Sequence, residues 1–349
     1  MAIILYILFF FFAILLSNSY KRKAVLYVLF ITCCVFSIWA GNRDIMSWAD
    51  TGGYVMAFQD LTPTISDFFT TKQIGLYSER GFFFLSSVIK TFTDSYVTYF
   101  LIIALLGFYF IGNGLKKYGI FPLIGLCVYI SRFVFGRHFI QIRSGLALAL
   151  LFWGLQYFTK KDWKRCAILI AVATLMHQSA LLAIPVYLMG YLKIKKKHIV
   201  WGLIISLILA GFFSDVILQY VQDVGEDINI SSYTDISDTY GKNRKGLGLA
   251  NPMIYYQMAI LLAFTFAEKR LRRLTPHYDT LRNGYFFSTV LLIVLGIFRV
   301  LSGRTSTVFA TYEILMVPLL VYLFNRKNRM IGYIGLAAIY STIFYLNFK

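Results

Sequence analysis

The sequence predicts an all-α, polytopic integral membrane protein with about ten full membrane spans and additional short re-entrant helices. Hydrophobic residues make up 58 % of the 349-residue chain and charged residues 14 %, against roughly 45–50 % and 25 % in soluble proteins. Apolar segments also recur at about the 20-residue length that crosses a bilayer as a helix. These features exclude a soluble enzyme, a disordered chain and a secreted disulfide scaffold.

The predicted spans follow one another along the whole chain. They cover about 2–19, 24–40, 95–113, 119–135, 139–158, 198–220, 250–267, 283–301, 305–324 and 330–347. The apolar segment 81–91 is too short to cross, at about 16 Å of helix. We expect it to dip into the membrane and return. Segment 165–192 is long enough, but His177-Gln178-Ser179 interrupts it, which indicates a hairpin of two short helices.

The basic residues give the orientation of these spans. The cluster at 21–23 follows the first apolar segment, whereas a cleavable signal peptide carries its charge before that segment. With two re-entrant segments, every dense basic cluster falls on the cytoplasmic side, as the positive-inside rule requires. These clusters are 21–23, 116–117, 160–165, 193–197, 269–273 and 326–329. The formal charge of +18 is then a topology signal, and no nucleic-acid partner is expected.

The remaining composition favours one transmembrane domain over residues 1–349. Only six prolines occur, so linkers are scarce. The four cysteines lie in or beside apolar segments without metal-type spacing and are expected to be small core residues. We therefore predict neither a metal site nor a cofactor.

The first of two outer loops, about 41–80, combines charged residues with aromatic residues. It contains Arg43, Trp48, Asp50, Tyr54 and Glu79. Carboxylates accept hydrogen bonds from sugar hydroxyls, and flat rings stack on the C–H faces of pyranoses. The loop is therefore a candidate sugar-binding site, with a solvated loop held by salt bridges as the alternative.

The second outer loop, about 221–250, is rich in acids, but these do not follow the calcium-loop pattern. It contains Lys242, Arg244 and Lys245, which are candidates for contact with an anionic headgroup. The loop is either a lid over an outer cavity or a plain solvated loop.

Charged residues within or beside apolar spans are more informative, because such groups are costly in lipid and usually face a cavity or a partner. Four arginines lie at outer span boundaries: Arg137, Arg143, Arg299 and Arg304. Guanidinium groups bind phosphate oxygens in bidentate fashion, although a single arginine there can also extend to the interface. His177 is either functional or a hydrogen-bonded core histidine. Glu313 either pairs with a buried arginine or transfers protons.

Taken in order, these motifs resemble the EpsG family, which belongs with the Wzy-type polymerases of O-antigen and exopolysaccharide. The resemblance covers about 40–320. It rests on Arg43, Asp50 and Tyr54, then Glu79-Arg80-Gly81-Phe82, Ile142-Arg143-Ser144-Gly145-Leu146-Ala147, His177-Gln178-Ser179-Ala180-Leu181, and Arg299 and Arg304 with Tyr312. One departure is that Asp50-Thr51-Gly52-Gly53-Tyr54 replaces a Gly-Asp-Tyr-type segment, which leaves open whether Asp44 or Asp50 is equivalent.

The resemblance implies a glycosyltransferase-C-like helical bundle in the bacterial cytoplasmic membrane, with its active site facing outward. Such enzymes transfer a glycan from one undecaprenyl-diphosphate carrier to another lipid-linked repeat unit, without a nucleotide sugar. Further partners would be the bilayer, a chain-length regulator and a flippase. The alternative functions are an integral-membrane acyltransferase or ligase acting on surface glycan, and a transporter of lipid-linked oligosaccharide.

The expected roles follow from this reaction. Arg137, Arg143, Arg299 and Arg304 would bind the diphosphates, while Arg43, Trp48, Asp50 and Tyr54 would bind sugar. His177 is the first choice for the general base, because the ordinary pKa of histidine lies near neutrality. Glu79 and Glu313 are the alternatives.

Overall fold

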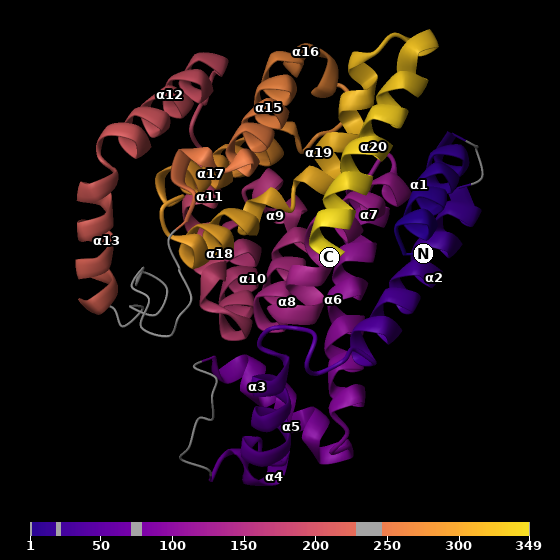
Figure 1. The fold of residues 1–349 in the computed structure, drawn as a ribbon, viewed down its shortest axis with the longest axis vertical. Coiled ribbons are helices and arrows are strands. Elements are labelled where there is room, and N and C mark those ends of the chain that lie inside the picture. Colours follow the sequence, from indigo (N-terminus) through magenta and orange to yellow (C-terminus); the bar gives the residue numbers. More distant parts are fainter. Residues whose placement is uncertain (1, 19–21, 71–78, 228–245, 349) are drawn as a thin grey trace. The chain divides into compact units, whose positions relative to one another are not determined.

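The computed structural model describes residues 2–18, 22–70, 79–227 and 246–348, and in these ranges every regular element is a helix (Figure 1). This confirms the all-α prediction. Lys242, Arg244 and Lys245 lie outside the described residues. The helices form two packing units, Met1–Ala183 with Glu313–Lys349 and Ile184–Tyr312. The assignment of the whole chain to one transmembrane domain stays a prediction.

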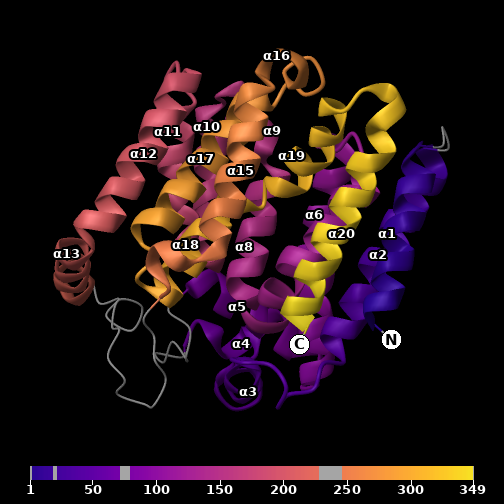
Figure 2. The same cartoon turned by 45° about the horizontal axis from the view of Figure 1, so that its top comes forward.

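The first unit is built on long helices joined by short connections. The N-terminal part of this unit includes α1 (Ala2–Asn18), α2 (Arg22–Gly41), α6 (Tyr96–Tyr118), α7 (Pro122–Tyr129), η2 (Ile130–Ile140), α8 (Ile142–Trp153), α9 (Leu155–Lys160), α10 (Trp163–Met176) and η3 (Gln178–Leu182). The helices between α2 and α6 are described below. The chain returns to this unit as α19 (Glu313–Leu320), η5 (Val321–Leu323), η6 (Arg326–Asn328) and α20 (Arg329–Phe348). Helix α6 packs against α2 and α8, and α20 packs against α1 and η2 (Figure 2).

Local sequence explains where several of these helices begin. The Ser95 side chain accepts a hydrogen bond from the Thr98 amide at 3.3 Å, which caps α6. Asp162 caps α10 in the same way through the Arg165 amide at 3.2 Å. Helix α7 begins at Pro122, a residue whose missing amide hydrogen costs nothing in the first turn. These caps satisfy amides that a helix leaves without partners.

The η2 segment is a π-helix of 11 residues, an uncommon form that occurs most often at functional positions. Together with α7 it makes one helical segment of 19 residues, Pro122–Ile140. The chain breaks at Gln141 (φ −101°, ψ 59°) and restarts at once as α8. The sequence had placed the boundary between these two spans near residue 137, because the apolar pattern continues through the break.

The segment predicted to be the first outer loop and the apolar segment that follows it fold into short helices around an aromatic core. They are α3 (Thr51–Met56), η1 (Ala57–Leu61), α4 (Ile65–Phe68) and α5 (Arg80–Phe92). Tyr54, Phe58 and Phe82 are buried in one cluster with Tyr99 from α6 and Ile142 from α8. The predicted re-entrant segment 81–91 is therefore one 13-residue helix packed on the rest of the unit.

The second unit begins within α11 (Ala183–Met189), at Ile184. Its other elements are α12 (Lys196–Phe212), α13 (Ser214–Asp227), η4 (Gly248–Ala250), α15 (Pro252–Phe266), α16 (Glu268–Leu271), α17 (Tyr278–Val294) and α18 (Arg299–Ala310). Helix α17 packs against α12, α15 and α18. The buried Arg282 in α17 donates to the carbonyl of Ile194 at 2.7 Å, which fastens the connection before α12.

Four helical segments of the described chain are individually long and apolar enough to cross a membrane, and two bent helix pairs raise this number to six. The four are Arg22–Gly41, Tyr96–Tyr118, Pro122–Ile140 and Arg326–Phe348. The structure is therefore that of a polytopic membrane protein, but ten full spans are not confirmed. One reason is that the predicted span 198–220 bends by 87° between α12 and α13. Several other apolar segments form helices of only 10–17 residues.

Candidate active site

The break at Gln141 positions Arg143 in the first turn of α8. Close packing between α8 and the end of η2 depends on Gly145, because a Cβ there would collide with the carbonyl of Arg137. Any side chain at this position would push the two segments apart. Because Gly145 has no side chain, the end of η2 and the first turn of α8 pack closely together. They form a corner in which Arg137 and Arg143 lie.

Four residues from separate parts of the first unit meet beside this corner. Glu79 precedes α5, Tyr54 lies in α3, Arg143 begins α8, and His177 follows α10. Helix α5 approaches α10 closely, because a Cβ on Gly81 would lie only 2.5 Å from the Cβ of Leu175. The sequence predicted a functional role for all four residues, and the structure brings them together.

The cluster is held by an ion pair between Arg143 and Glu79. Arg143 Nη1 donates to Glu79 Oε2, and Arg143 Nε donates to the hydroxyl of Tyr54 at 3.3 Å. Glu79 is 8 % exposed and His177 is 6 % exposed, so both are shielded from solvent. His177 Nε2 lies 3.9 Å from Glu79 Oε1, so the carboxylate has a nitrogen donor group on each side.

The hydrogen bonds of His177 define its tautomer. Its Nδ1 accepts a hydrogen bond from the backbone amide of Ser179 at 3.1 Å, which makes His177 the N-cap of η3. A neutral imidazole that accepts at one nitrogen carries its proton on the other. The proton of neutral His177 therefore lies on Nε2, which faces Glu79. Nδ1 contacts both the amide and, at 2.8 Å, the hydroxyl of Ser179, whereas Nε2 lies near the Glu79 carboxylate but beyond hydrogen-bond distance.

The other predicted acids of the first outer loop have different surroundings. Asp44 is exposed and accepts hydrogen bonds from the Ser47 hydroxyl and the Met46 amide. The bond from Ser47 is the largest cause of the lowered pKa of Asp44. Asp50 is also exposed and has a left-handed backbone (φ 64°) immediately before α3. Asp44 thus closes a local turn, and the choice between Asp44 and Asp50 as the family equivalent is not decided by these contacts.

Arg43 and Trp48 are packed against aromatic rings rather than displayed on the loop surface. The Arg43 guanidinium lies 3.4 Å from the centroid of Phe100 and donates to the carbonyl of His138 at 2.8 Å. Burial lowers the pKa of Arg43 to about 10, so it is cationic at neutral pH. Trp48 stacks on Phe135 with ring centroids 5.6 Å apart. Sugar binding by these two residues stays a prediction.

Glu313 has an arginine partner that the sequence analysis missed. It is 0 % exposed at the start of α19, and its Oε2 lies 3.7 Å from Nε of Arg132 in η2. Arg137, on the same π-helix, is buried with its guanidinium 4.3 Å from the centroid of Phe133. Of the two interpretations of Glu313, the contacts support pairing with an arginine, although the Arg132 side chain is 14 % exposed rather than fully buried. The sequence feature that could have identified this pair is Arg132 itself, a charged residue inside an apolar segment.

His138 was also missed. It is buried in η2, hydrogen-bonds the Tyr129 hydroxyl through Nε2 at 2.8 Å, and stacks on Phe108 with centroids 4.1 Å apart. Gly107 leaves room for its ring, because a Cβ at that position would lie 2.6 Å from His138 Cε1. This histidine is a fully packed core residue.

Arg299 and Arg304 lie on α18 of the second unit. Arg299 is exposed and Arg304 is partly exposed. Their participation in a diphosphate site with Arg137 and Arg143 stays a prediction. Among the described residues, no group of three or more histidine, cysteine or acidic side chains is arranged to hold a metal ion.

Comparison with known proteins gives one result. A sequence model described as the EpsG family matches residues 26–349, nearly the whole chain. Neither a curated protein nor a solved structure matches.

Proposed function

Because the chain belongs to the EpsG family, whose members are Wzy-like polysaccharide polymerases, we propose that it joins lipid-linked oligosaccharide repeat units during surface polysaccharide synthesis. The donor and acceptor would both be undecaprenyl-diphosphate-linked glycans in the bacterial cytoplasmic membrane, and the site would face outward. The observation that carries this proposal is the cluster of Glu79, Arg143, His177 and Tyr54, in which every residue except the partly exposed Arg143 is buried. It combines a carboxylate for proton transfer with a guanidinium suited to a phosphate.

Ten spans and an outward-facing site are part of the same proposal. In that topology Glu79 and Arg143 lie at the outer ends of their helices, where a lipid-linked diphosphate would also lie. The polyprenyl tails would occupy the surrounding bilayer. A chain-length regulator and a flippase would be functional partners.

The reaction requires one proton transfer and one leaving group. The acceptor hydroxyl gives its proton to the base, and its oxygen forms a bond to the anomeric carbon of the donor. The bond between that carbon and the diphosphate oxygen breaks, and the electron pair leaves with the diphosphate. Arginines stabilise the departing charge, since preorganised cations act most strongly where charge develops. We assign this role to Arg143 and Arg137, and we keep diphosphate binding by Arg299 and Arg304 as a prediction from the sequence.

Glu79 is our choice for the general base, in preference to His177. A base needs a lone pair directed at the acceptor proton. The imidazole uses its Nδ1 lone pair for the Ser179 amide and presents Nε2–H to Glu79. The carboxylate therefore receives the proton, while His177 and Arg143 orient it. Tyr54 and Asp50 would bind sugar near the same place.

Two variants separate the roles of Glu79 and His177. Glu79→Gln keeps the shape but removes the base, and we expect transfer to fall by on the order of 10²–10⁴-fold. His177→Asn keeps an acceptor that can cap η3, because asparagine is a good N-cap residue, but it cannot titrate. We expect a loss at least about tenfold smaller than that of Glu79→Gln. Equal losses would return the role of base to His177.

The reaction itself is tested by deletion and complementation, with glycans separated on gels. A polymer ladder that collapses to one repeat unit on deletion, and returns with the intact gene but not with Glu79→Gln, supports the proposal. An unchanged ladder that loses only an acyl group would indicate an acyltransferase. Repeat units that accumulate without crossing the membrane would indicate a transporter.

A further inference from the structure

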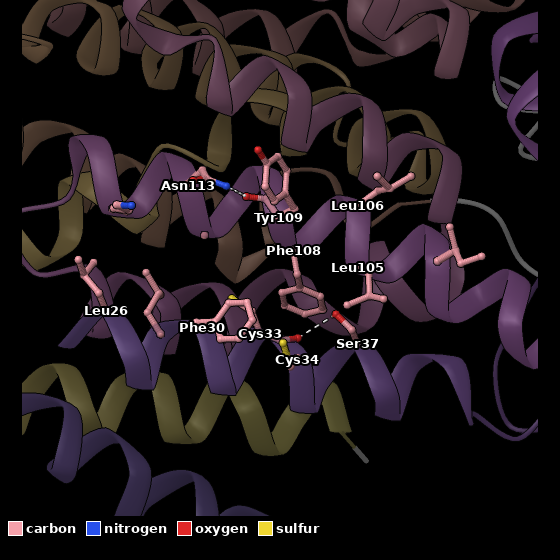
Figure 3. Close-up of a pocket in the computed structure, with 14 residues that line it drawn as sticks. Leu26, Phe30, Cys33, Cys34, Ser37, Leu105, Leu106, Phe108, Tyr109 and Asn113 are labelled. Carbon is pink, nitrogen blue, oxygen red and sulfur yellow. Dashed lines mark hydrogen bonds between the residues drawn. The ribbon is translucent and has the colours of Figure 1, made fainter. Parts of the chain in front are cut away.

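A groove runs between α2 and α6 on the first unit, and none of the four residues of the Glu79 cluster lines it (Figure 3). Its volume is about 470 Å³. Its lining residues are Leu26, Leu29, Phe30, Cys33, Cys34 and Ser37 on α2, with Ile102, Leu105, Leu106, Phe108, Tyr109, Gly112, Asn113 and Lys116 on α6. Ten of these fourteen residues are hydrophobic, so the groove suits a hydrocarbon chain.

The groove has a buried floor and an exposed rim. Cys33 and Phe108 in the floor are 8 % and 1 % exposed, whereas Phe30 and Tyr109 at the rim are 68 % and 61 % exposed. Only 33 % of the apolar part of α2 is buried within the protein. A membrane helix with this exposure contacts lipid, and the groove therefore opens to the bilayer.

The two helices are antiparallel, which gathers positive charge at one end of the groove. A Cβ on Gly41 would contact Leu101, and a Cβ on Gly112 would contact Cys33, so α2 and α6 run in opposite directions. The start of α2 therefore lies beside the end of α6. Arg22, Lys23, Lys116 and Lys117 are exposed at this shared end.

The dimensions match a lipid of one leaflet. From residue 102 to residue 116, α6 rises roughly 21 Å at 1.5 Å per residue, and one leaflet with its headgroup region is about 20–22 Å thick. The lysine at the end of the groove, Lys116, would then lie at headgroup level. Basic pockets between membrane helices bind anionic headgroups in this way, especially in the cytoplasmic leaflet.

We propose that this groove binds an anionic phospholipid, with an acyl chain along α2 and α6 and its phosphate at Lys116. The charged end is the cytoplasmic end in the topology proposed above, and the inference does not depend on the reaction at Glu79. A second copy of the chain is a poor occupant for this face. Two-fold pairing there would bring the basic ends of two copies together, and like charges repel.

The test titrates the full-length protein, purified in detergent, with phosphatidylglycerol or with phosphatidylcholine of the same acyl chains. Native mass spectrometry measures the binding constant of the first lipid. We expect phosphatidylglycerol to bind about tenfold or more tightly than phosphatidylcholine, because several cations contribute. Equal binding of the two lipids would overturn the proposal.

Two substitutions of exposed lysines locate the headgroup. Lys116→Gln should weaken phosphatidylglycerol binding about fivefold, which corresponds to about 1 kcal/mol for one basic residue near a membrane surface. Lys160→Gln is the matched control, since Lys160 is an exposed lysine at the end of α9 that does not line the groove. Equal effects of the two substitutions would contradict a specific site.

A third variant, Gly112→Phe, fills the groove and should weaken the binding of both lipids. Its unfolding temperature is measured alongside, and Lys116→Gln decides the proposal if this variant does not fold. Normal binding by a folded Gly112→Phe protein would place the lipid elsewhere. Undecaprenyl phosphate is added as a competitor, and displacement of phosphatidylglycerol at lower concentration would identify a polyprenyl site and overturn the phospholipid assignment.

Discussion

The ion pair between Glu79 and Arg143 should be strongly coupled, and a double-mutant cycle measures that coupling. The Glu79 side chain is 7 % exposed and that of Arg143 is 20 % exposed. Removing one partner of a buried pair costs about 3–5 kcal/mol, because it leaves a charge buried without compensation. Since Arg143 is partly exposed, we expect Arg143→Met to lower the free energy of unfolding by about 3 kcal/mol.

The second variant of the cycle, Glu79→Gln, should cost less. Arg143 keeps its hydrogen bond to Tyr54 and is the more exposed partner. We expect about 1.5–3 kcal/mol, the range for a hydrogen bond to a charged group. The double variant no longer contains an uncompensated carboxylate. Its destabilisation should fall short of the sum of the single values by about 2 kcal/mol, within the range of residues in direct contact.

The assay is reversible unfolding in mixed detergent micelles, followed by tryptophan fluorescence. Asp162 and Arg165 provide the control cycle, because their 3.5 Å ion pair is more exposed, at 33 % and 65 %. Exposed pairs contribute about 0.2–1 kcal/mol, so their coupling should be small even though Asp162→Ala also removes the cap of α10. A Glu79–Arg143 coupling no larger than that of the control would refute the assignment of a tight buried pair.

Three further outcomes are expected. Arg143→Lys should be nearly as inactive as Arg143→Ala on a glycan ladder, because lysine cannot bind phosphate oxygens in bidentate fashion; a lysine variant that keeps most of the ladder would show that only the charge matters. Gly145→Ala should lower the free energy of unfolding by about 1–3 kcal/mol, because the new Cβ would collide with the Arg137 carbonyl. Gly136→Ala is the control in the same unfolding assay. It should be nearly neutral, because a Cβ at Gly136 has no atom within 4 Å. Arg43→Lys should cost about 1–2 kcal/mol through loss of stacking on an aromatic ring, and an unchanged unfolding free energy would contradict that contact's importance.

The sequence allowed the helical class and most of the Glu79 cluster to be predicted. Intramembrane charge is costly, so Arg143 and His177 stood out from their apolar surroundings. The predicted count of about ten spans is not confirmed, because apolar composition continues through backbone breaks. The break at Gln141 and the bend between α12 and α13 depend on packing rather than on residue type.

Dependence on packing and backbone geometry also explains why some residues were missed in the sequence or assigned a different role. Arg132 lies in an apolar segment, and only its distance from Glu313 identifies its role. His177 was the first choice for a base because of its residue type. Its suitability depends on which nitrogen accepts a hydrogen bond, and that is determined by the Ser179 amide two residues away. The proposal of Glu79 as the base therefore rests on local backbone geometry, which composition does not reveal.

The energetics of the ion pair also bear on its function. Replacing a whole buried ion pair with apolar residues is often neutral or stabilising, so such a pair is weak evidence for a stabilising role. If Glu79→Met/Arg143→Met unfolds at the same free energy as the native protein, the pair is not required for the fold. Loss of polymerisation in that folded variant would then be attributable to the chemistry of the two groups. A folded and fully active double variant would remove both residues from the proposed mechanism.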